Sequence, residues 1–344
     1  MKKVLITGTA GFIGFHLVKC MVDYEYNIIG YDNINDYYDV NLKYARLKET
    51  GIEKDQIKYG KKIQSSLYHN YHFIKANLED RILMEKLFKK ERFDIVVNLA
   101  AQAGVRYSIE NPFSYVESNL VGFINILECC RHNNIKHLVY ASSSSVYGNN
   151  DKIPFSEEDR VDYPVSLYAA TKKANELMAH TYSHLYQLPS TGLRFFTVYG
   201  PWGRPDMAPM IFAKAIRCNK SINIYNNGNL SRDFTYISDI IQGLVCVINN
   251  KPKEDKFAHV YNIGYGHPIQ LIDFIRIMEK KMSKIATKIM LPMQNGDVYQ
   301  TYACTSKLEQ DFNYKPKIGI EEGLTSFINW YLSDNNPIDK KVCI

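Results

Sequence analysis

A glycine-rich turn at the start of the chain constrains the fold more than any other feature. The apolar run Val4–Thr7 leads directly into Gly8, Gly11 and Gly14, and a helical pattern begins at Phe12. Glycines at this spacing allow a tight turn and a close approach of the backbone to a pyrophosphate, which then binds at the positive end of the helix. A strand that passes directly into such a helix predicts an α/β fold with a dinucleotide site. The predicted binding residues of this turn are Gly8, Gly11, Phe12, Ile13 and Gly14.

Short β-rich runs alternate with amphipathic stretches over the first 200 residues, which predicts repeated βαβ units. The expected strands are Val4–Thr7, Ile28–Tyr31, His72–Ala76, Ile95–Leu99, His137–Ser142 and Ser190–Phe196. The expected helices are Phe12–Val22, Glu79–Lys90, Pro112–His132 and Leu167–Tyr186. This pattern indicates a Rossmann-type doubly wound parallel sheet with helices on both faces.

The same pattern suggests two domains. Residues 1–200 are expected to form the dinucleotide-binding domain, interrupted by a long Tyr- and Lys-rich segment at 33–71 that is either a lid-like insertion or a surface excursion. After Tyr199 the alternation becomes irregular, so residues 201–344 are expected to form mainly a smaller α/β substrate domain. Later segments of this part can still return to the large sheet.

An acidic residue ends the second expected strand. Asp32 follows the glycines by roughly 20 residues, where a carboxylate can accept hydrogen bonds from the adenosine ribose. Its charge would repel a 2′-phosphate, and no arginine precedes Arg46, so the predicted cofactor is NAD and not NADP. The alternative is that Asp32 only caps the following loop.

Composition excludes several other classes of protein. The net charge of +6 over 344 residues is spread along the chain, without the basic stripe that nucleic-acid binding requires. No apolar stretch approaches the ~18 residues of a membrane span. The seven cysteines form no C-x-x-C pair and no cluster at zinc spacing, which predicts no metal site, reduced thiols and a cytoplasmic location.

A tyrosine and a lysine stand four residues apart in the last expected helix of the first domain. Tyr168 and Lys172 therefore share one helix face. In a chain with 26 tyrosines such a pair is by itself typical of a solvated face. Here the strand ending in Ser142 is followed by three more serines, a hydroxyl cluster at the sheet edge where ligands bind. A phenol that acts as a base near pH 7 needs its pKa lowered from ~10 to about 7, which corresponds to about 4 kcal/mol of differential stabilisation. A neighbouring ammonium together with the nicotinium charge of the cofactor can supply this.

Together these motifs resemble the extended short-chain dehydrogenase/reductase family, and most closely its NAD-dependent sugar-nucleotide 4-epimerases. The resemblance covers nearly the whole chain. The segments that carry it are Gly8–Gly14, Asp32–Asn33, Asn98–Ala101, Ser142–Gly148, Tyr168 with Lys172, and Ser231–Asp233.

The resemblance implies a role for each matching residue. Tyr168 is the expected base, Lys172 binds the nicotinamide ribose and tunes Tyr168, and Ser143 hydrogen-bonds the reacting hydroxyl. The 25-residue gap to Tyr168 favours Ser143, while Ser142 and Ser144 remain alternatives. Asn119 matches a position of mainly structural importance. The remaining cofactor residues implied are Asn33, Asn77, Leu78, Leu99, Ala100 and Ala101.

Three longer segments are similar to the UDP-glucuronate 4-epimerase subgroup. They are Asp36–Asp39, Gly104–Pro112 and Phe195–Pro205. The similarity implies that Thr197 and Arg204 meet the sugar carboxylate, that Arg232 clamps the UDP phosphates, and that Thr301 lines the sugar pocket. Alternatively, Arg204 is a surface arginine and Arg232 forms a rim salt bridge with Asp233.

The reaction implied is interconversion of UDP-glucuronate and UDP-galacturonate through a transient 4-keto sugar, with NAD regenerated in each cycle. Related dehydratases and decarboxylases carry carboxylates where this chain has Ser144 and Ser145, so simple epimerisation is favoured. The alternative substrates are UDP-N-acetylhexosamines or UDP-hexoses, and a non-catalytic NAD-sensing regulator is a more remote alternative. A homodimer built from the helices Pro112–His132 and Leu167–Tyr186 and a role in polysaccharide biosynthesis are further expectations from the resemblance.

Overall fold

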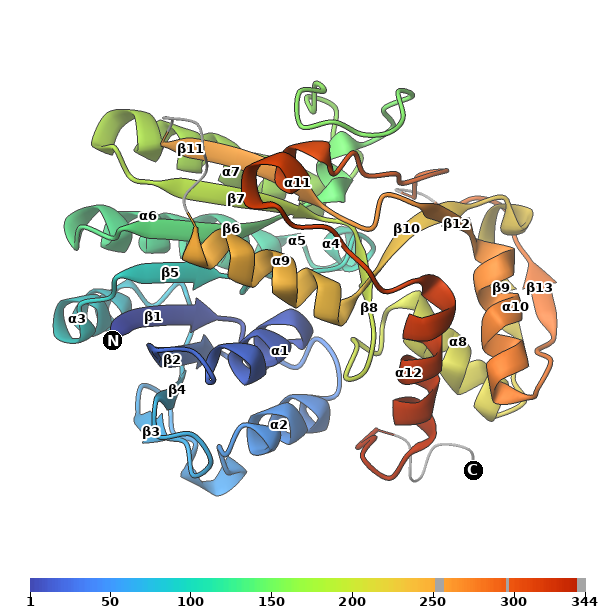
Figure 1. Ribbon diagram of the computed structural model, residues 1–344, viewed down its shortest axis with the longest axis horizontal. Coiled ribbons are helices and arrows are strands. Elements are labelled where there is room, and N and C mark those ends of the chain that lie inside the picture. Colours follow the sequence, from blue (N-terminus) through green and yellow to red (C-terminus); the bar gives the residue numbers. More distant parts are fainter. Residues whose placement is uncertain (251–256, 295–296, 339–344) are drawn as a thin grey trace.

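The protein, seen here in a computed structural model that describes residues 1–250, 257–294 and 297–338, is built around one large sheet (Figure 1). Its strand order is β11-β7-β6-β5-β1-β2-β4-β3, and only β3 is antiparallel to its neighbour. The fold class predicted from the sequence is confirmed, and each predicted strand is present. The strands are β1 (Lys2–Thr7), β2 (Tyr26–Asp32), β3 (Lys62–Gln64), β4 (Tyr71–Lys75), β5 (Ile95–Asn98), β6 (His137–Ser143), β7 (Ser190–Phe195) and β11 (Ala258–Ile263).

The chain reverses its direction of travel across the sheet at β1. It first proceeds outward through β2 and β4, and then crosses back to β5, β6 and β7 on the other side of β1. In open α/β sheets ligands bind at the carboxyl edge of such a switch point. Thr7 and Asn98, which end β1 and β5, are paired in register there. The glycine turn and the segment after β5 therefore begin side by side.

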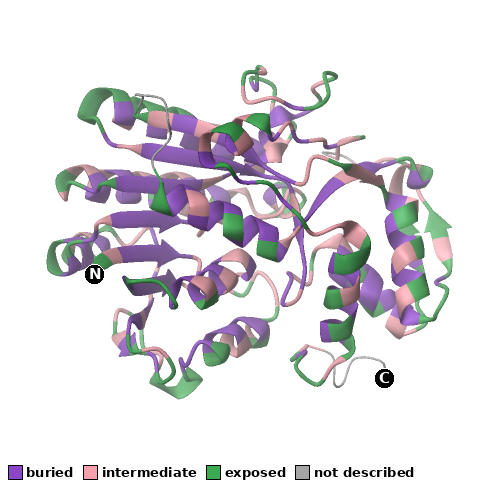
Figure 2. Ribbon diagram, in the orientation of Figure 1, coloured by how far each residue is buried: buried purple, intermediate pink, exposed green. Residues whose placement is uncertain are grey.

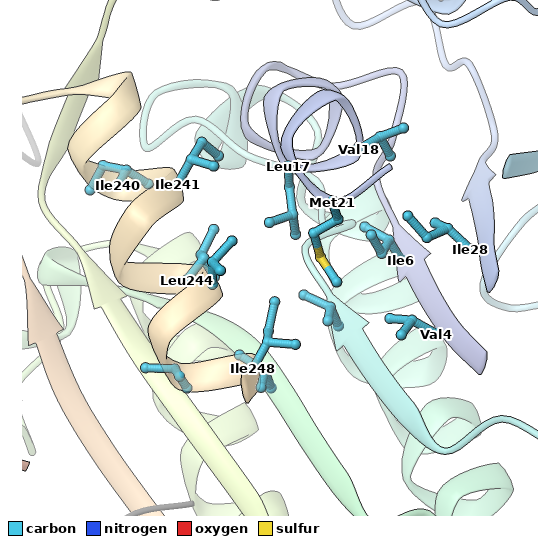
Figure 3. Packing of buried hydrophobic residues seen from close by; sticks show 14 of the residues in the cluster. Val4, Ile6, Leu17, Val18, Met21, Ile28, Ile240, Ile241, Leu244 and Ile248 are labelled. Atoms are coloured by element: carbon cyan, nitrogen blue, oxygen red, sulfur yellow. The ribbon is translucent and has the colours of Figure 1, made fainter. Parts of the chain in front are cut away.

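Helices cover both faces of this sheet, so its central strands are buried on both sides, as Figure 2 shows. One face carries α1 (Phe12–Met21), α9 (Ile237–Asn249) and α11 (Ser306–Phe312), and the other carries α3 (Arg81–Glu91), α6 (Gly122–His132) and α7 (Leu167–Tyr186). In Figure 3, Leu17 and Met21 of α1 face Leu244 and Ile248 of α9 above the sheet. Burial on both faces explains why the strands read as continuous apolar runs.

A smaller lobe is formed mainly by the chain after β7 and lies beside the large sheet (Figure 1). Its own core unites α8 (Ala208–Arg217), α10 (Leu271–Met282) and α12 (Ile320–Leu332). Its strands are β8 (Thr197–Tyr199), β10 (Ser231–Tyr236) and β12 (Pro268–Gln270) in one sheet, and β9 (Ile222–Ile224) with β13 (Lys288–Met290) in another. The chain leaves this lobe to contribute α9, β11 and α11 to the large one.

The segment 33–71 is largely part of the main lobe. It contains α2 (Val40–Glu49), a 3-10 turn at Lys54–Gln56 and strand β3, which pairs with β4 at the sheet edge. Leu47 and Ile52 are fully buried in the core beneath α1. The first residues of the segment, before α2, instead line the cavity described below.

The predicted helix Pro112–His132 is interrupted. The structure has α5 (Pro112–Tyr115), a π-helical turn at Val116–Val121, and then α6; the short α4 (Tyr107–Glu110) precedes them. Gly122 follows the wide turn and packs against Leu78, where an added Cβ would lie 2.7 Å from the Leu78 Cβ. The wide turn also places Asn119 toward α7, a tertiary requirement that the helical periodicity does not reveal.

The cysteines differ in one respect from the prediction of reduced thiols. Cys20, Cys129, Cys130, Cys246 and Cys304 are free, whereas Cys218 is disulfide-bonded. Sequence spacing could not show this, because pairing depends on distances in the folded chain. Over the described ranges, no helix is both long and apolar enough to span a membrane.

His16 of α1 links the two lobes. Its ring Nε2 hydrogen-bonds the carbonyl oxygen of Pro201 at 2.9 Å. Burial lowers the pKa of His16 from 6.5 to about 4, and the neighbouring charge of Arg46 acts in the same direction. The imidazole is therefore neutral near pH 7.

This shift predicts a pH-dependent contribution to stability. Because the folded pKa lies below the unfolded value, the contribution is complete above about pH 6.5 and is lost as the pH falls toward 4. Its full size is about 3 kcal/mol. Urea unfolding of the wild type and of His16→Gln at pH 4.5 and 7.5 should show a smaller loss of unfolding free energy in the variant. Equal losses in the two proteins would contradict this account of His16.

Candidate functional site

A cavity of about 930 Å³ extends from the carboxyl edge of the large sheet into the smaller lobe. It brings together most of the residues predicted from the sequence. Those that line it are Gly8, Gly11, Phe12, Ile13, Gly14, Asp32, Asn33, Leu78, Leu99, Ala100, Ala101, Ser143, Tyr168, Lys172, Thr197, Arg204 and Arg232.

Two predicted residues, Asn77 and Thr301, do not line the cavity. The backbone carbonyl of Asn77 accepts a hydrogen bond from the Tyr31 hydroxyl at 2.7 Å. The next residue, Leu78, forms part of the cavity wall. Thr301 lies behind β10, where its hydroxyl accepts a hydrogen bond from the backbone N–H of Asp233 at 3.2 Å. Both residues support neighbours that do reach the cavity.

The glycine turn leaves no room for side chains. A Cβ on Gly14 would lie 2.1 Å from the carbonyl oxygen of Gly8, and one on Gly8 would lie 2.9 Å from the backbone nitrogen of Ala100. Gly8 also has a φ of +77°, which glycine adopts without strain. The turn therefore presents bare backbone and the first N–H groups of α1 to the cavity. This cradle fits the pyrophosphate of a dinucleotide.

Asp32 lies beside this turn and is almost fully buried. Its two carboxylate oxygens accept hydrogen bonds from the backbone N–H groups of Ala10 at 3.0 Å and Ile34 at 2.8 Å. Asp32 thus caps the following loop, as the alternative interpretation proposed, and also faces the cavity. Each oxygen retains a free lone pair, so the carboxylate can still accept a ribose hydroxyl.

The backbone beside Asp32 is strained. Ile34 is a buried, β-branched residue with a φ of +55°. Such residues rarely adopt this conformation, and they do so where the surroundings enforce it. The hydrogen bond from Ile34 N–H to Asp32 holds the turn and directs the following residues toward the cavity.

Tyr168 and Lys172 lie in the first turns of α7. The Ser166 hydroxyl caps this helix by accepting the Ala169 N–H at 3.1 Å. The Lys172 ammonium donates to the carbonyl of Ala141 at 2.9 Å and lies 6.0 Å from the centre of the Tyr168 ring. Burial lowers the pKa of Lys172 to about 8. The two side chains share one helix face, as their spacing predicted.

The protein groups alone do not produce an acidic phenol. Burial raises the pKa of Tyr168, and the hydrogen bond with Ser143 and the charge of Arg204 oppose this rise without outweighing it. The lowering of this pKa by the Lys172 ammonium together with the nicotinamide charge of a bound cofactor stays a prediction. Lys172 is itself desolvated and donates to the Ala141 carbonyl.

The four serines after β6 have different surroundings. Ser142 is buried and donates to Glu176 at 2.6 Å, so its hydroxyl is already engaged. Ser143 accepts the N–H of Ser145 at 3.2 Å and donates to the Ser145 hydroxyl at 3.1 Å. Ser143 lines the cavity together with Tyr168 and acts to lower the pKa of that phenol, so it is the serine placed to act together with it.

A buried polar network fixes this edge of the sheet. Glu176, two turns beyond Tyr168 on α7, accepts two 2.8 Å hydrogen bonds from Arg194 on β7. Arg194 also donates to the Tyr147 hydroxyl at 2.9 Å, which in turn donates to Asn262 on β11 at 2.7 Å. Removing one member would leave a buried charge or polar group unpaired, so the network rigidly positions the serine loop.

Asn119 connects α7 to the segment after β5. The side-chain amide of Asn119 accepts the Gln102 backbone N–H at 2.8 Å. It donates to the Gln102 backbone carbonyl at 3.0 Å and to the Thr171 hydroxyl at 3.1 Å. The backbone carbonyl of Asn119 accepts from the Asn175 side-chain amide at 2.7 Å. These polar groups of Asn119 all hydrogen-bond other parts of the protein, which is consistent with the structural role that the resemblance implied.

Arg204 lines the cavity and is not a simple surface arginine. It forms a two-point pair with Asp206. Tyr37 donates to the same carboxylate at 3.0 Å, and its ring lies 5.7 Å from the guanidinium. Burial raises the pKa of Asp206, but the charge and hydrogen bonds of Arg204 outweigh it and leave the pKa lowered. Arg204 is thus held from one side, with its remaining N–H groups available to an anionic ligand.

Arg232 also lines the cavity, and its ion-pair partner is Asp297 at 2.5 Å. It donates further to the carbonyls of Ser231 and Tyr299. The alternative partner, Asp233, is fully buried and accepts the backbone N–H groups of Tyr265, Gly266 and Ala303. Asp233 therefore organises the loops below Arg232, and the proposed rim salt bridge between these two residues is not formed.

The comparisons with known proteins agree with this geometry. Residues 4–264 match the model of the NAD dependent epimerase/dehydratase family. The chain belongs to that family. Over the part of the chain that the structure describes, no group of three or more His, Cys, Asp or Glu side chains is arranged to hold a metal ion.

Members of the family with similar sequences and structures carry informative names. The chain is 51% identical to Protein CapI of Staphylococcus aureus, over 96% of this chain and 98% of that one. It is 44% identical to the probable UDP-glucuronate 4-epimerase of Rhizobium meliloti, over 96% of each chain. The crystal structure of UDP-glucuronic acid 4-epimerase from Bacillus cereus with UDP-glucuronic acid and NAD superposes with a TM-score of 0.85, at 32% identity, over 95% of this chain and 98% of that one.

The structure adds cavity residues that the sequence did not predict. The carboxylates Asp206 and Asp297, which pair with the two arginines, had no local signal because each pairing depends on the fold. Tyr37 and Arg106 lie within segments noted for their similarity to the uronate subgroup of this epimerase family, so a signal existed for them. The remaining additions include Tyr38, Lys43, Tyr107, Asn223 and Tyr225.

Proposed function

We propose that this protein is an NAD-dependent UDP-sugar 4-epimerase that interconverts UDP-glucuronate and UDP-galacturonate. The observation that carries the proposal is the convergence of Tyr168, Ser143 and Arg204 on one cavity that begins at the glycine turn. The names of the similar proteins support it, because they include UDP-glucuronate 4-epimerases from different organisms. The structure with a TM-score of 0.85 contains both UDP-glucuronic acid and NAD.

The cofactor site proposed for NAD comprises the glycine turn, Asp32, Leu99, Ala100 and Lys172. The glycine backbone receives the pyrophosphate, and the Asp32 carboxylate accepts the ribose hydroxyls. Bound NAD would supply the hydride acceptor and donor for C4 of the sugar, and its nicotinamide charge would favour ionisation of the Tyr168 phenol, whose pKa burial raises.

The proton chemistry is assigned to Tyr168 and Ser143. The Tyr168 oxygen removes the proton of the sugar 4-hydroxyl as C4 is oxidised, and it returns the proton when the 4-keto sugar has turned over. Ser143, in the same cavity, is assigned to hydrogen-bond the same sugar hydroxyl. Ser144 and Ser145 provide no carboxylate for proton transfer beyond C4, which favours epimerisation over dehydration or decarboxylation.

The two arginines divide the substrate between them. Arg204, with Thr197 nearby in the cavity wall, is assigned to the sugar carboxylate, and Arg232 to the diphosphate. A planar guanidinium suits both groups because it can donate to two oxygens at once. Burial lowers the pKa of Arg232, the pair with Asp297 opposes this, and the charge of Arg106 adds to the lowering, so two arginines lie near one carboxylate in this part of the cavity. An anionic diphosphate fits that environment.

The direct test of the function is to incubate the protein with UDP-glucuronate, without added NAD, and to measure the UDP-galacturonate formed by chromatography. Tyr168→Phe should lower kcat by roughly 10²- to 10⁴-fold, the usual worth of a general base. The matched control is Tyr163→Phe, since Tyr163 is 85% exposed and should tolerate the change. If the wild type converts no UDP-glucuronate even with added NAD, UDP-N-acetylglucosamine and UDP-glucose are tested next. Failure with all three would favour the NAD-sensing regulator.

Replacement of Arg204 tests the substrate assignment. Arg204→Leu should lower kcat/KM for UDP-glucuronate by roughly 100-fold, because a lost charge-assisted pair costs about 3 kcal/mol. Asp206→Asn is introduced with it, so that no unpaired carboxylate remains beside the sugar. Slow turnover of UDP-glucose should persist in the double variant. A wild type that prefers the neutral sugar would refute the carboxylate assignment.

We further propose that the protein is a homodimer through α5, α6 and α7. These helices pack together in one layer, and they expose large apolar side chains that a monomer would leave in water. The exposed residues on these helices, and on the π-helical turn between α5 and α6, include Phe113 (76%), Val121 (43%), Leu177 (56%) and Leu185 (59%). Leu177 and Leu185 are eight residues apart and so lie on the same face of α7.

The dimer predicts a mass of about twice 39.8 kDa by light scattering. The double variant Leu177→Glu/Leu185→Glu should be monomeric, because it places charges in the apolar contact. Ile285→Glu serves as the control, since Ile285 is 89% exposed and lies in the smaller lobe. A monomeric wild type would rule the dimer out.

A further inference from the structure

Arg46 is the largest fully buried side chain that the proposed reaction does not use. It lies in α2, within the segment 33–71, and is 0% exposed. Its guanidinium donates to the carbonyl of Ala10 at 2.9 Å and to the Tyr38 hydroxyl at 2.7 Å. It also donates to the carbonyl of Trp202 at 2.6 Å and to that of Gly203 at 3.3 Å.

These partners do not compensate the charge of Arg46. All four are uncharged oxygens, and within the described residues no carboxylate pairs with the guanidinium. Its Nε has no hydrogen-bond partner there either. A buried, unpaired cation is costly, and stability alone would favour an apolar side chain at such a position. The geometry of the four contacts therefore calls for an explanation beyond packing.

The contacts join two loops with different tasks. Ala10 stands between Gly8 and Gly11 in the turn that cradles the dinucleotide. Trp202 and Gly203 directly precede Arg204. His16, in the helix that begins at the glycine turn, holds the carbonyl of Pro201 in the same loop. Residues 201 to 203 are thus bonded to α1 or, through Arg46, to the cofactor turn, and Arg204 reaches into the cavity.

The loop before Arg204 has a backbone that requires such restraint. Trp202 has a φ of +63°, a conformation that bulky residues rarely adopt. Residues in this region persist where surrounding contacts impose it. The hydrogen bond from Arg46 to the Trp202 carbonyl is among the shortest that Arg46 makes, and it acts at the strained residue.

We propose that Arg46 is a positioning residue that bridges the dinucleotide turn and the loop carrying the substrate arginine. Through this bridge, ordering of one site orders the other. The role given to Arg204 rests on the proposed function, whereas the link to the cofactor turn does not. It also assigns a task to the segment 33–71, which supplies both Arg46 and its partner Tyr38.

The test compares Arg46→Gln, Arg46→Lys and the control Arg276→Gln, whose arginine side chain is 70% exposed. Three quantities are measured on each full-length protein: NAD retained after gel filtration, KM and kcat for UDP-glucuronate with added NAD, and the thermal midpoint. For Arg46→Gln we expect less NAD to be retained, KM to rise by about 10-fold, and kcat to change little. A change of this size lies within the range by which residues between two sites alter their coupling. Arg46→Lys, whose single ammonium cannot span all four acceptors, should be intermediate, and Arg276→Gln should match the wild type.

The outcomes separate the alternatives. If Arg46→Gln lowers only the thermal midpoint and keeps wild-type NAD retention and KM, the bridge is refuted. If Arg46→Gln does not fold, Arg46→Lys decides in the same way, and wild-type values in that variant refute the bridge. Should UDP-glucuronate fail as a substrate of the wild type, retention of NAD still tests the link to the cofactor turn, because it needs no turnover.

Discussion

The close packing of Gly14 against the carbonyl of Gly8 is the constraint on which the rest of the site depends. With 2.1 Å between that oxygen and the position of a Gly14 Cβ, α1 can begin directly beneath β1. This places Asp32 and the segment after β5 around the same turn, since Ala10 N–H reaches Asp32 and Gly8 packs on Ala100. It also brings His16 within reach of Pro201, and Ala10 within reach of Arg46, which bonds the next residue of the same loop, Trp202. One backbone contact therefore sets the cofactor cradle and the junction between lobes.

Much of the main lobe could be predicted because its signals are local. A glycine turn, buried apolar strands and a Tyr/Lys pair at helical spacing each depend on neighbours in the sequence, and the parallel sheet then gathers their carboxyl ends. Helix α7 has the bounds that were predicted, Leu167–Tyr186. The break in the helix Pro112–His132 was not predictable, because the π-turn follows from the contacts of Asn119 with Gln102 and Thr171 on other elements.

The partners of charged side chains were the hardest to predict. Arg204 and Arg232 were found through family resemblance, but their carboxylates Asp206 and Asp297 were not. For Arg232, the sequence suggested its neighbour Asp233, whereas alternation along β10 turns that carboxylate toward three backbone N–H groups on the other side. Ion pairing in a cavity is decided by which loops meet there, and short-range patterns carry little of that information.

These ion pairs affect how an anionic substrate would be recognised. An arginine left unpaired in a partly buried cavity would be costly before the substrate arrives, and Asp206 and Asp297 reduce that cost. A substrate carboxylate or phosphate must then share the guanidinium with an existing partner, so the gain in affinity is smaller than for a free arginine. The benefit is orientation: Asp206 and Tyr37 fix the plane of Arg204 in advance, which reduces the entropy lost on binding. Selectivity for a uronate would then depend on where these partners hold the guanidinium as much as on its charge.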